Sequence, residues 1–411
     1  MLVCVAGYIL TSVGRVHQLY AVLEVLRPAI VTGFGAIALY LMDQRGARRL
    51  GLLRVPTTRY VLLLLVWMTL SLPGSIFRGN SFELLTDSFI KTVLMYLVVA
   101  GAVRGARDVE RLAFVYYLAA AVYAWVVLTR FDLGGGNAWR LGRLYYYDAN
   151  DFATFAVTAI PLGLYFAHAG RRLITKAFAV AALVVLALAF VRSGSRGGFL
   201  SLVCVGIFIV FRYSAIAFRW RLSAFTLVAA VLVVTASGEY WRQMGTILSD
   251  TDYNHTEESG RLQIWKRGLG YMLESPVFGV GADNFETAEG TLSPLAIRQQ
   301  FGRGVRWTAA HNSYIQIGAE LGFPGLLFFL AALASGFTAL VGPQRSAGGE
   351  GGLPDRTSAL RQALVSSLIG FVVGAFFLSL AYHEIAYTLM ALAVGLRKVV
   401  DPPMPRRLRS T

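Results

Sequence analysis

The sequence predicts an all-α integral membrane protein with about twelve transmembrane helices and a helical loop domain between the ninth and tenth spans. Of its 411 residues, 56% are hydrophobic and only 15% are charged, whereas a soluble protein carries about 25% charged residues. Apolar stretches near the bilayer-crossing length of about 20 residues recur along the chain. Lysine and arginine gather in alternate connecting segments, as the positive-inside rule requires.

Twelve stretches are candidate membrane spans because each is apolar and approaches the length needed to cross a bilayer. They are residues 1–14, 26–42, 60–76, 88–103, 112–129, 153–168, 173–191, 197–211, 221–236, 312–341, 360–380 and 382–396. The first stretch has neither a basic start nor a small-residue cleavage site, so we do not expect a cleaved signal peptide.

The placement of lysine and arginine predicts that both ends of the chain lie in the cytoplasm. In that topology the inside segments hold 22 of the 38 basic residues. Seven others lie in the long interval 237–311, and long segments cross the membrane largely regardless of charge. With that interval set aside, 22 basic residues lie in the inside segments and 9 lie on the outside. Because the net charge of +15 is spread over these short loops, we do not expect nucleic-acid binding.

The chain divides into four parts on this topology. Residues 1–236 carry the first nine spans, and residues 312–396 carry the last three. Between them, residues 237–311 form a large loop on the outer face, which is too long to be a plain connector. This loop contains amphipathic helical patterns such as "GRLQIWKRGLGYMLESP". Residues 397–411 are a basic cytoplasmic tail.

Two arginines at the outer face are candidate anion-binding residues. Arg196, in "VRSGSRGGFL", stands where the eighth span begins, and a helix N-terminus presents free N–H groups that suit anions. The alternative is an arginine that anchors the helix among lipid headgroups. Arg261 begins an amphipathic helix, where a cation is unfavourable unless an anion compensates it. Glu257 and Glu258 could compensate Arg261 locally, or the guanidinium could hold phosphate oxygens in a bidentate manner.

His311 is the candidate catalytic base. It stands at the head of "HNSYIQIGAELGFPG", between the chain's longest polar interval and a strongly apolar one. The ordinary pKa of histidine, about 6.5, suits a general base at neutral pH. A histidine at a membrane interface is also commonly a hydrogen-bonded structural residue. With two arginines nearby, the protonated form would be disfavoured, which leaves a neutral base.

Four further residues are candidates for secondary or acceptor-binding roles. Asn312 follows the histidine and could cap the tenth span, as could Ser313. Arg192 lies close to Arg196 at the end of the seventh span. His383 and Glu384 fall in a tight outer turn, where they could orient an acceptor sugar or pair with each other.

No metal site is expected. Asp250 and Asp252 in "DTD" could bind a divalent cation, but two acids in a polar loop are more often solvated. Cys4 and Cys204 lie in different apolar spans, with no histidine or cysteine at ligand spacing beside them.

The motifs "SRGGFL", "GRLQIW" with "SPVFGVGADNF", and "HNSYIQIGAELGFPGLL" together resemble the bacterial O-antigen ligase and polymerase superfamily. They occur in the family's order and at comparable spacing. The resemblance implies a multi-pass glycosyltransferase of the bacterial inner membrane, whose active site faces the periplasm and whose large loop is periplasmic. It implies an undecaprenyl-diphosphate-linked glycan as donor. It also implies that His311 deprotonates the acceptor hydroxyl, that Arg196 and Arg261 hold the diphosphate, and that the reaction inverts the anomeric carbon without a metal or other cofactor.

Acceptor choice separates the functions that the resemblance allows. The first is an O-antigen ligase, which joins the glycan to lipid A core. The second is a polymerase of O-antigen or exopolysaccharide, or a protein O-oligosaccharyltransferase, of the same superfamily. A flippase or transporter of lipid-linked glycans belongs to a different class. Transporters typically have polar or broken helices at mid-membrane, whereas the polarity here concentrates at the outer edge, which favours an enzyme. A purely structural scaffold leaves the three basic side chains unexplained.

Overall fold

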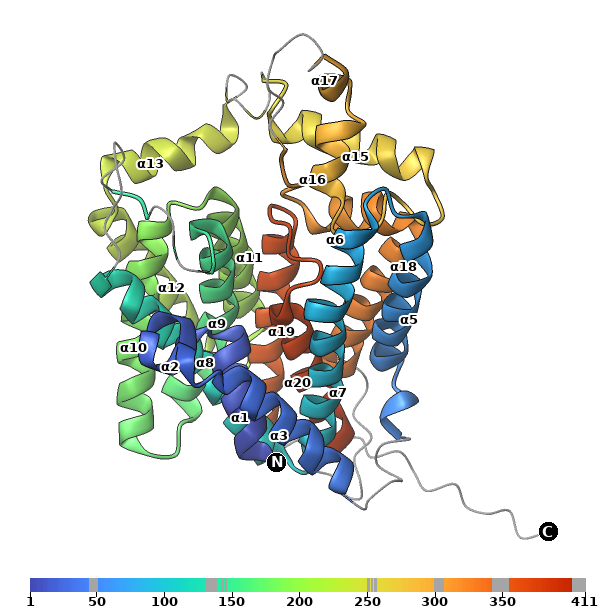
Figure 1. Cartoon of the computed structure of the whole chain (residues 1–411). Helices are drawn as coiled ribbons and strands as arrows, with labels where there is room; N and C mark the ends of the chain where they lie inside the picture. Colours follow the sequence, from blue (N-terminus) through green and yellow to red (C-terminus); the bar gives the residue numbers. More distant parts are fainter. Residues whose placement is uncertain are drawn as a thin grey trace, which may run out of the picture.

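The protein is all-helical in the computed structural model (Figure 1). The structure describes residues 1–43, 51–130, 139–141, 144, 146–249, 252, 254, 257–298, 307–341 and 355–400. Every regular element in these ranges is a helix, as the hydropathy pattern predicts. Six of the described helices are long and apolar enough to cross a membrane. They are Arg78–Ala102 (α6 to α7), Ala106–Arg130 (α8), Ala149–Ala169 (α9), Leu173–Ser193 (α10), Ser313–Val341 (α18) and Arg356–Ala375 (in α19).

A seventh span results if the helices Phe218–Val234 and Gly238–Gly245, bent by 109° from each other, count as one crossing. Each of the twelve predicted stretches overlaps a helix, although several of these helices are short. The remaining ones are α1 (Leu2–Tyr8), α3 (Pro28–Met42), α5 (Pro56–Ser71), α11 (Arg196–Arg212), α12 (Phe218–Thr235) and α20 (Glu384–Val400), while α7 by itself is Ile90–Ala102. The all-α membrane class is thus confirmed, and the count of twelve crossings stays a prediction.

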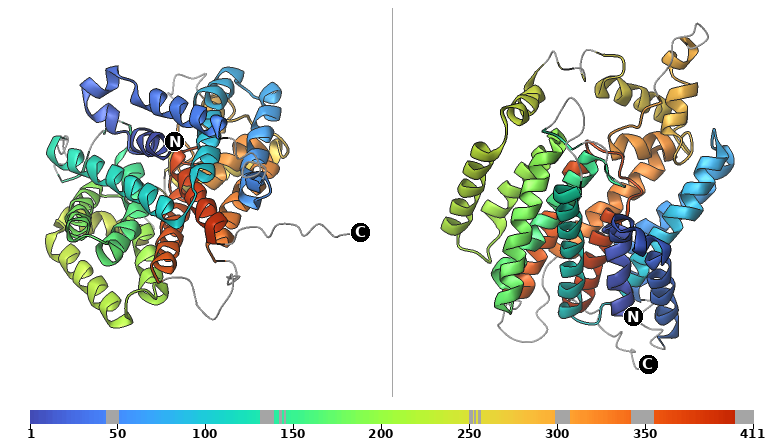
Figure 2. Two further views of the ribbon diagram at one scale, coloured as in Figure 1. Left: turned by 90° about the horizontal axis from the view of Figure 1, so that it is seen from below. Right: turned by 60° about the vertical axis from the view of Figure 1, so that its left-hand side comes forward.

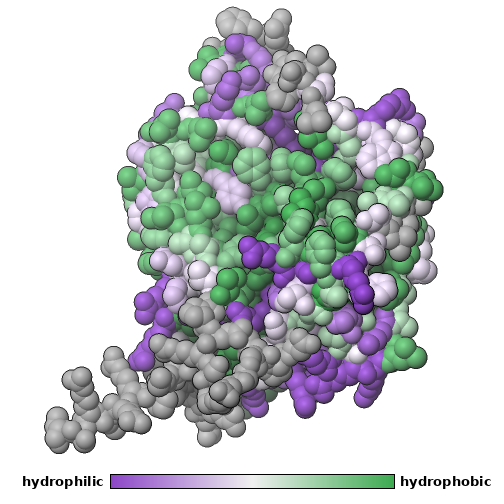
Figure 3. All heavy atoms as spheres, turned by 180° about the vertical axis from the view of Figure 1, so that it is seen from behind, coloured by the Kyte–Doolittle hydropathy of each residue, from purple (hydrophilic) through white to green (hydrophobic). Residues whose placement is uncertain are grey.

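The helices α19 and α20 occupy the middle of the bundle. α19 and α20 run between the group formed by α9, α10 and α11 and the group formed by α5, α7 and α18 (Figures 1 and 2). Every residue from Ile385 to Leu396 of α20 is buried. A helix that is apolar on all sides is expected in the interior, and its small alanines allow neighbouring helices to approach closely. Hydrophobic residues cover the middle of the molecular face in Figure 3, as a lipid-facing surface requires.

Four helices lie at the end of the molecule opposite the N-terminus: α13 (Gly238–Gly245), α15 (Arg261–Glu274), α16 (Phe285–Thr291) and α17 (Pro294–Ile297) (Figure 1). A buried ion pair joins α15 to α16, with Arg267 Nη2 2.6 Å from Glu289 Oε2. Tyr271 donates its hydroxyl to the same carboxylate at 2.9 Å. Because the carboxylate of α16 binds two side chains of α15, it fixes the relative position of the two helices.

Helix α18 is broken at Gly322, whose φ of 68° and ψ of −171° are not helical. Pro324 follows within the same turn and has no N–H to donate. The break leaves three backbone carbonyls to be paired elsewhere, and each accepts a hydrogen bond from outside the helix. The donors are Val280 N to Ala319 O at 2.9 Å, Gly281 N to Glu320 O at 2.9 Å and Trp67 Nε1 to Leu321 O at 3.0 Å. The glycine-rich "VFGVGADNF" motif therefore docks against the broken helix.

Replacing Gly322 with alanine is expected to destabilise the protein by about 2 kcal/mol or more, because its backbone conformation is essentially restricted to glycine. A Cβ at this position would lie 2.5 Å from the carbonyl oxygens of both Pro276 and Val277. Thermal unfolding in detergent, followed by intrinsic fluorescence, measures the effect. Gly105→Ala is the matched control, since a Cβ there meets nothing within 4 Å. Equal midpoints for the two variants would contradict this account of the break.

Candidate active site

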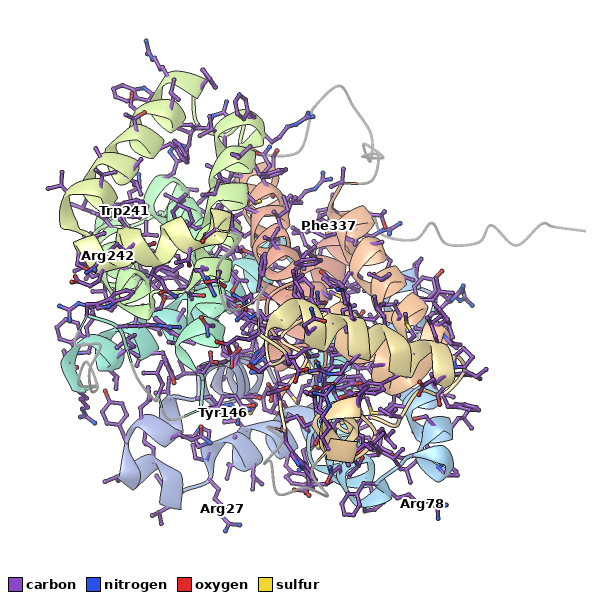
Figure 4. All side chains as sticks on the ribbon, turned by 90° about the horizontal axis from the view of Figure 1, so that it is seen from above. Arg27, Arg78, Tyr146, Trp241, Arg242 and Phe337 are labelled. Carbon is purple, nitrogen blue, oxygen red and sulfur yellow. The ribbon has the colours of Figure 1, made fainter. Side chains whose placement is uncertain are left out.

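A polar cavity of about 240 Å³ lies beneath the helices at the end of the molecule opposite the N-terminus. Arg196, Arg261 and His311, which come from three separate segments of the sequence, all line it. In the view from above, α13 with Trp241 and Arg242 crosses one half of the molecule and α15 crosses the other (Figure 4). Each of these helices contributes one lining side chain, Gln243 from α13 and Arg261 from α15. The complete lining is Arg140, Asn150, Gly194, Ser195, Arg196, Gly197, Gln243, Arg261, His311, Phe377 and Leu378.

Arg196 is held at the first position of α11. Ser195 caps this helix, because its hydroxyl accepts a hydrogen bond from Gly198 N at 3.1 Å. Gly194 ends α10 with a φ of 58°, a left-handed conformation that glycine adopts without steric cost. The Arg196 guanidinium donates through Nη1 to Thr246 Oγ1 at 2.7 Å and to Asp252 Oδ2 at 2.8 Å. These two bonds orient the guanidinium at the wall of the cavity.

The pair between Arg196 and Asp252 is shielded from solvent, with side-chain exposures of 14% and 8%. Burial by itself raises the pKa of Asp252. Hydrogen bonds from Asn254 and from Arg196, together with the positive charge of Arg196, outweigh burial and leave the pKa below its ordinary value. Asp252 is therefore a carboxylate at neutral pH, and it offsets part of the positive charge of Arg196.

Arg261 is the first residue of α15. The preceding residue is Gly260, which provides no side-chain cap for the first-turn N–H groups. One turn further along the helix, the Trp265 indole donates to the carbonyl of Ala310 at 3.0 Å, and its ring packs edge-on against Phe376 at 5.2 Å. The "GRLQIW" motif therefore does two things: it places an arginine at the cavity and it holds the segment that carries His311.

His311 lies just before α18 in a left-handed backbone conformation, with a φ of 48°. Its N–H donates to Ser379 Oγ at 3.0 Å. Ser313, two residues later, donates its hydroxyl to Leu378 O at 2.7 Å and accepts from Leu380 N at 2.8 Å. The segment between α19 and α20 thereby fixes the histidine backbone on one side, while Trp265 fixes the residue before it on the other.

Four helix N-termini meet around this cavity. Asn150 is in the first turn of α9, Arg196 and Arg261 begin α11 and α15, and His311 stands two residues before α18. Each N-terminus contributes partial positive charge and N–H groups, which add to the charges of three lining arginines. None of the lining residues is acidic in the described part of the chain. This arrangement favours an anion with several oxygen atoms, such as a phosphate or diphosphate.

Comparison with known families identifies the part of the chain that carries this site. Residues 181–330 match the family model described as O-antigen ligase. Residues 181–330 are an O-antigen ligase family domain. A search of the curated proteins found no match to the chain. The resemblance seen in the sequence motifs is thus confirmed for this interval.

The O-antigen ligase domain extends from within α10 to within α18, and it contains Arg196, Arg261 and His311. Membership of this domain in the family implies glycan transfer of the ligase or polymerase type, with lipid-linked glycan substrates. Together with the membrane-length helices, it makes the chain a multi-pass membrane protein.

Two lining residues outside the O-antigen ligase domain were not among the candidates from sequence. Arg140 belongs to the segment before α9, and its guanidinium donates to Ser193 O at 3.0 Å and to Asn150 Oδ1 at 3.3 Å. Asn150 stands in the first turn of α9, where Asp148 caps the helix by accepting from Asn150 N and Asp151 N at 2.7 Å each. The third arginine of the cavity thus precedes the family domain in sequence.

The four secondary candidates lie outside the lining of the cavity. Asn312 is a buried cap of α18, and its Oδ1 accepts from Tyr314 N at 2.9 Å and Ile315 N at 3.1 Å. Arg192 is exposed on the last turn of α10. Glu384 lies 3.1 Å from Arg15 Nη2 and 3.6 Å from His383 Nδ1. Glu384 thus pairs with Arg15 in the N-terminal part of the chain and also lies beside His383.

Of the two aspartates that formed the candidate metal site, the structure describes one. Asp250 lies outside the described residues, and Asp252 contacts Arg196. In the described ranges, no three histidine, cysteine, aspartate or glutamate side chains form a group suited to a metal ion. Independence from metals stays a prediction to be tested with the enzyme.

Proposed function

We propose that this protein is an O-antigen ligase of the bacterial inner membrane. In this proposal it transfers a glycan from undecaprenyl diphosphate to a hydroxyl of lipid A core at the periplasmic face. The support is one observation: three arginines and His311 line a single cavity without an acidic lining residue in the described part of the chain. A flippase has no need of a base beside an anion site.

The three arginines would hold the diphosphate. A guanidinium binds phosphate oxygens through two parallel hydrogen bonds, and Arg140, Arg196 and Arg261 stand on three different segments around the cavity. Diphosphate becomes a good leaving group once its charge is matched, so preorganised arginines can replace a metal ion. At about 240 Å³ the cavity lies below the range of about 300–1,000 Å³ usual for whole small-molecule ligands. It suits the reacting end of the donor, with the glycan and the lipid tail outside.

His311 would supply the base. Its side chain takes the proton from the acceptor hydroxyl while the acceptor oxygen forms a bond to the anomeric carbon of the donor glycan. The bond between that carbon and the phosphate oxygen breaks, and undecaprenyl diphosphate leaves with both electrons of the bond. Because the nucleophile enters opposite the leaving group, the anomeric configuration inverts. The proton on His311 then passes to solvent.

The experiment that tests this proposal is transfer by the purified full-length protein in the presence of a chelator. The donor is undecaprenyl-diphosphate glycan, and separate reactions contain lipid A core, a second lipid-linked glycan or an acceptor protein. We expect product with lipid A core, at a rate that EDTA leaves unchanged, because arginines carry the charge of the leaving group. Product analysis by mass spectrometry and by the anomeric coupling constant reports the acceptor and the stereochemistry.

Each alternative outcome of this experiment has a distinct meaning. Product only with the second lipid-linked glycan would make the protein a polymerase, and product only with the acceptor protein would make it a protein O-oligosaccharyltransferase. Product only after Mg²⁺ is added would mean that a metal ion matches the charge of the diphosphate, with Asp250 and Asp252 as its candidate ligands. Movement of the lipid-linked glycan across vesicles without any new glycosidic bond would favour the flippase.

A further inference from the structure

A second cavity, of about 500 Å³, lies at the other end of the bundle. It is formed by the start of α8, the end of α9 and the start of α10. Four arginines line it together with apolar side chains, which distinguishes it from the mainly polar candidate active site. The lining residues are Arg107, Glu110, Arg111, Phe114, Val115, Phe166, Gly170, Arg171, Arg172 and Thr175.

The position of this cavity along α9 places it at the level of lipid headgroups. Asn150, in the first turn of α9, lines the candidate active site, whereas Phe166, near its last turn, lines the second cavity. A helix of 21 residues is about 30 Å long, which matches the hydrocarbon thickness of a bilayer. The two cavities are therefore separated by about one membrane thickness, and the connection between α9 and α10 lies at the lower end of Figure 1.

The charge of the second cavity is strongly positive. Glu110 is the acidic residue among its lining residues, and Oε1 of this carboxylate lies 3.4 Å from Nη2 of Arg356 on α19. Arg356 also donates to the carbonyl of Ala169 at the end of α9. Since Arg356 matches the negative charge of Glu110, this carboxylate does not neutralise the positive charge of the four lining arginines. Arg111, whose side chain is exposed, contacts the half-buried Asp108 at 3.6 Å, and such a surface contact matches its charge weakly.

The apolar part of the cavity favours a lipid over a free phosphate as the ligand. Phe114 and Phe166 pack edge-on at 5.1 Å and form a rigid wall beside Val115. On the first turn of α10, next to Arg172, Leu173 is 82% exposed and Ile174 is 75% exposed. Large apolar side chains exposed in this way beside arginines require an environment that is apolar on one side and anionic on the other. The headgroup region of a membrane provides both.

We propose that this cavity binds one anionic glycerophospholipid. The headgroup phosphate lies among Arg107, Arg171 and Arg172, and the first part of an acyl chain lies against Phe114 and Phe166. The site is on the membrane face opposite glycan transfer, so it is independent of the donor, the acceptor and the proposed chemistry.

Lipid retention tests the proposal without any use of transferase activity. The full-length protein is reconstituted into nanodiscs of equal parts phosphatidylglycerol and phosphatidylcholine, released, and measured by native mass spectrometry. We expect the native protein to retain phosphatidylglycerol in preference to phosphatidylcholine. The double variant Arg171→Gln/Arg172→Gln is expected to weaken this retention by about tenfold or more, since each arginine near a membrane surface contributes about a factor of five. Arg54→Gln/Arg59→Gln is the matched control, because it removes the same charge near the start of α5 and neither residue lines the cavity.

A second variant separates loss of the site from loss of surface charge. Thr175→Trp places an indole ring in the cavity and keeps all four arginines, and it is expected to weaken phosphatidylglycerol retention as the double variant does. Inorganic phosphate at millimolar concentration is expected to leave the retained lipid in place. Equal losses in the cavity and control double variants, unchanged retention in Thr175→Trp, or displacement of the lipid by inorganic phosphate would each overturn the proposal.

Discussion

Replacing His311 with asparagine is expected to lower the turnover of glycan transfer by about 10²–10⁴-fold, the usual contribution of a general base. Asparagine suits this position because it tolerates the left-handed conformation that His311 adopts at a φ of 48°. The backbone bond to Ser379 and the cap formed by Asn312 involve no atom of the histidine side chain. Both are therefore retained in the variant.

Initial rates at saturating donor measure this effect. We expect kcat to fall while the KM for the donor stays near its native value, because the three arginines of the cavity are unchanged. His168→Asn is the matched control: the same side chain is removed from the last turn of α9, at the other end of that helix, and native turnover is expected. If His311→Asn retained more than about a tenth of native turnover, His311 would not be the base.

The helical membrane class follows from hydropathy because every backbone group in a bilayer must be hydrogen-bonded within its own segment. All twelve apolar stretches overlap helices for that reason. The break in α18 does not follow from the same rule. "GFPG" marks a weak point in the helix, but the hydrogen bonds that compensate it come from Trp67, Val280 and Gly281. Donors so distant in sequence leave no local pattern.

The same distinction applies to the candidate active site. Arg196, Arg261 and His311 carry local motifs, and the structure brings them to one cavity. Arg140 has no such motif, since an arginine in a polar loop is indistinguishable from a solvated one until Ser193 and Asn150 are placed beside it. Helical periodicity also reveals only part of the role of Trp265. It predicts that the ring lies on the apolar face of α15, but it does not predict the hydrogen bond from the indole N–H to the carbonyl of Ala310. Long-range polar contacts are thus the part of the site that sequence reasoning misses.

Replacing Arg196 with glutamine is expected to lower turnover by about 10²–10³-fold, the cost of losing one charged donor to a developing anion. Two effects combine in this variant. The diphosphate loses a guanidinium, and the carboxylate of Asp252, which lies 2.8 Å from Arg196 in the native protein, now adds its negative charge close to the anion site. Arg261→Gln is expected to have the first effect, because it too removes a guanidinium from the lining of the cavity.

The second effect is separable because Asp252→Asn removes the carboxylate. We expect Arg196→Gln/Asp252→Asn to recover about tenfold of the activity lost by Arg196→Gln, a coupling in the range measured for residues in contact. Arg242 and Glu239 form the matched control cycle. They are 2.9 Å apart on α13 and far more exposed, so no coupling in turnover is expected. A double variant as slow as Arg196→Gln alone would contradict the repulsive role of Asp252.

The pH dependence of stability provides an independent measure of the same pair. Because hydrogen bonds from Asn254 and Arg196, together with the charge of Arg196, hold the pKa of Asp252 below its ordinary value in the folded protein, these interactions contribute their full stability above the unfolded pKa of about 3.9. That contribution is lost as pH falls through the lower folded value. The native protein is therefore expected to lose more thermal stability than Asp252→Asn when the pH is lowered from 5 to about 3. Identical pH profiles for the two proteins would show that Arg196 and Asp252 do not interact in the folded enzyme, and the expected rescue of Arg196→Gln would then have no physical basis.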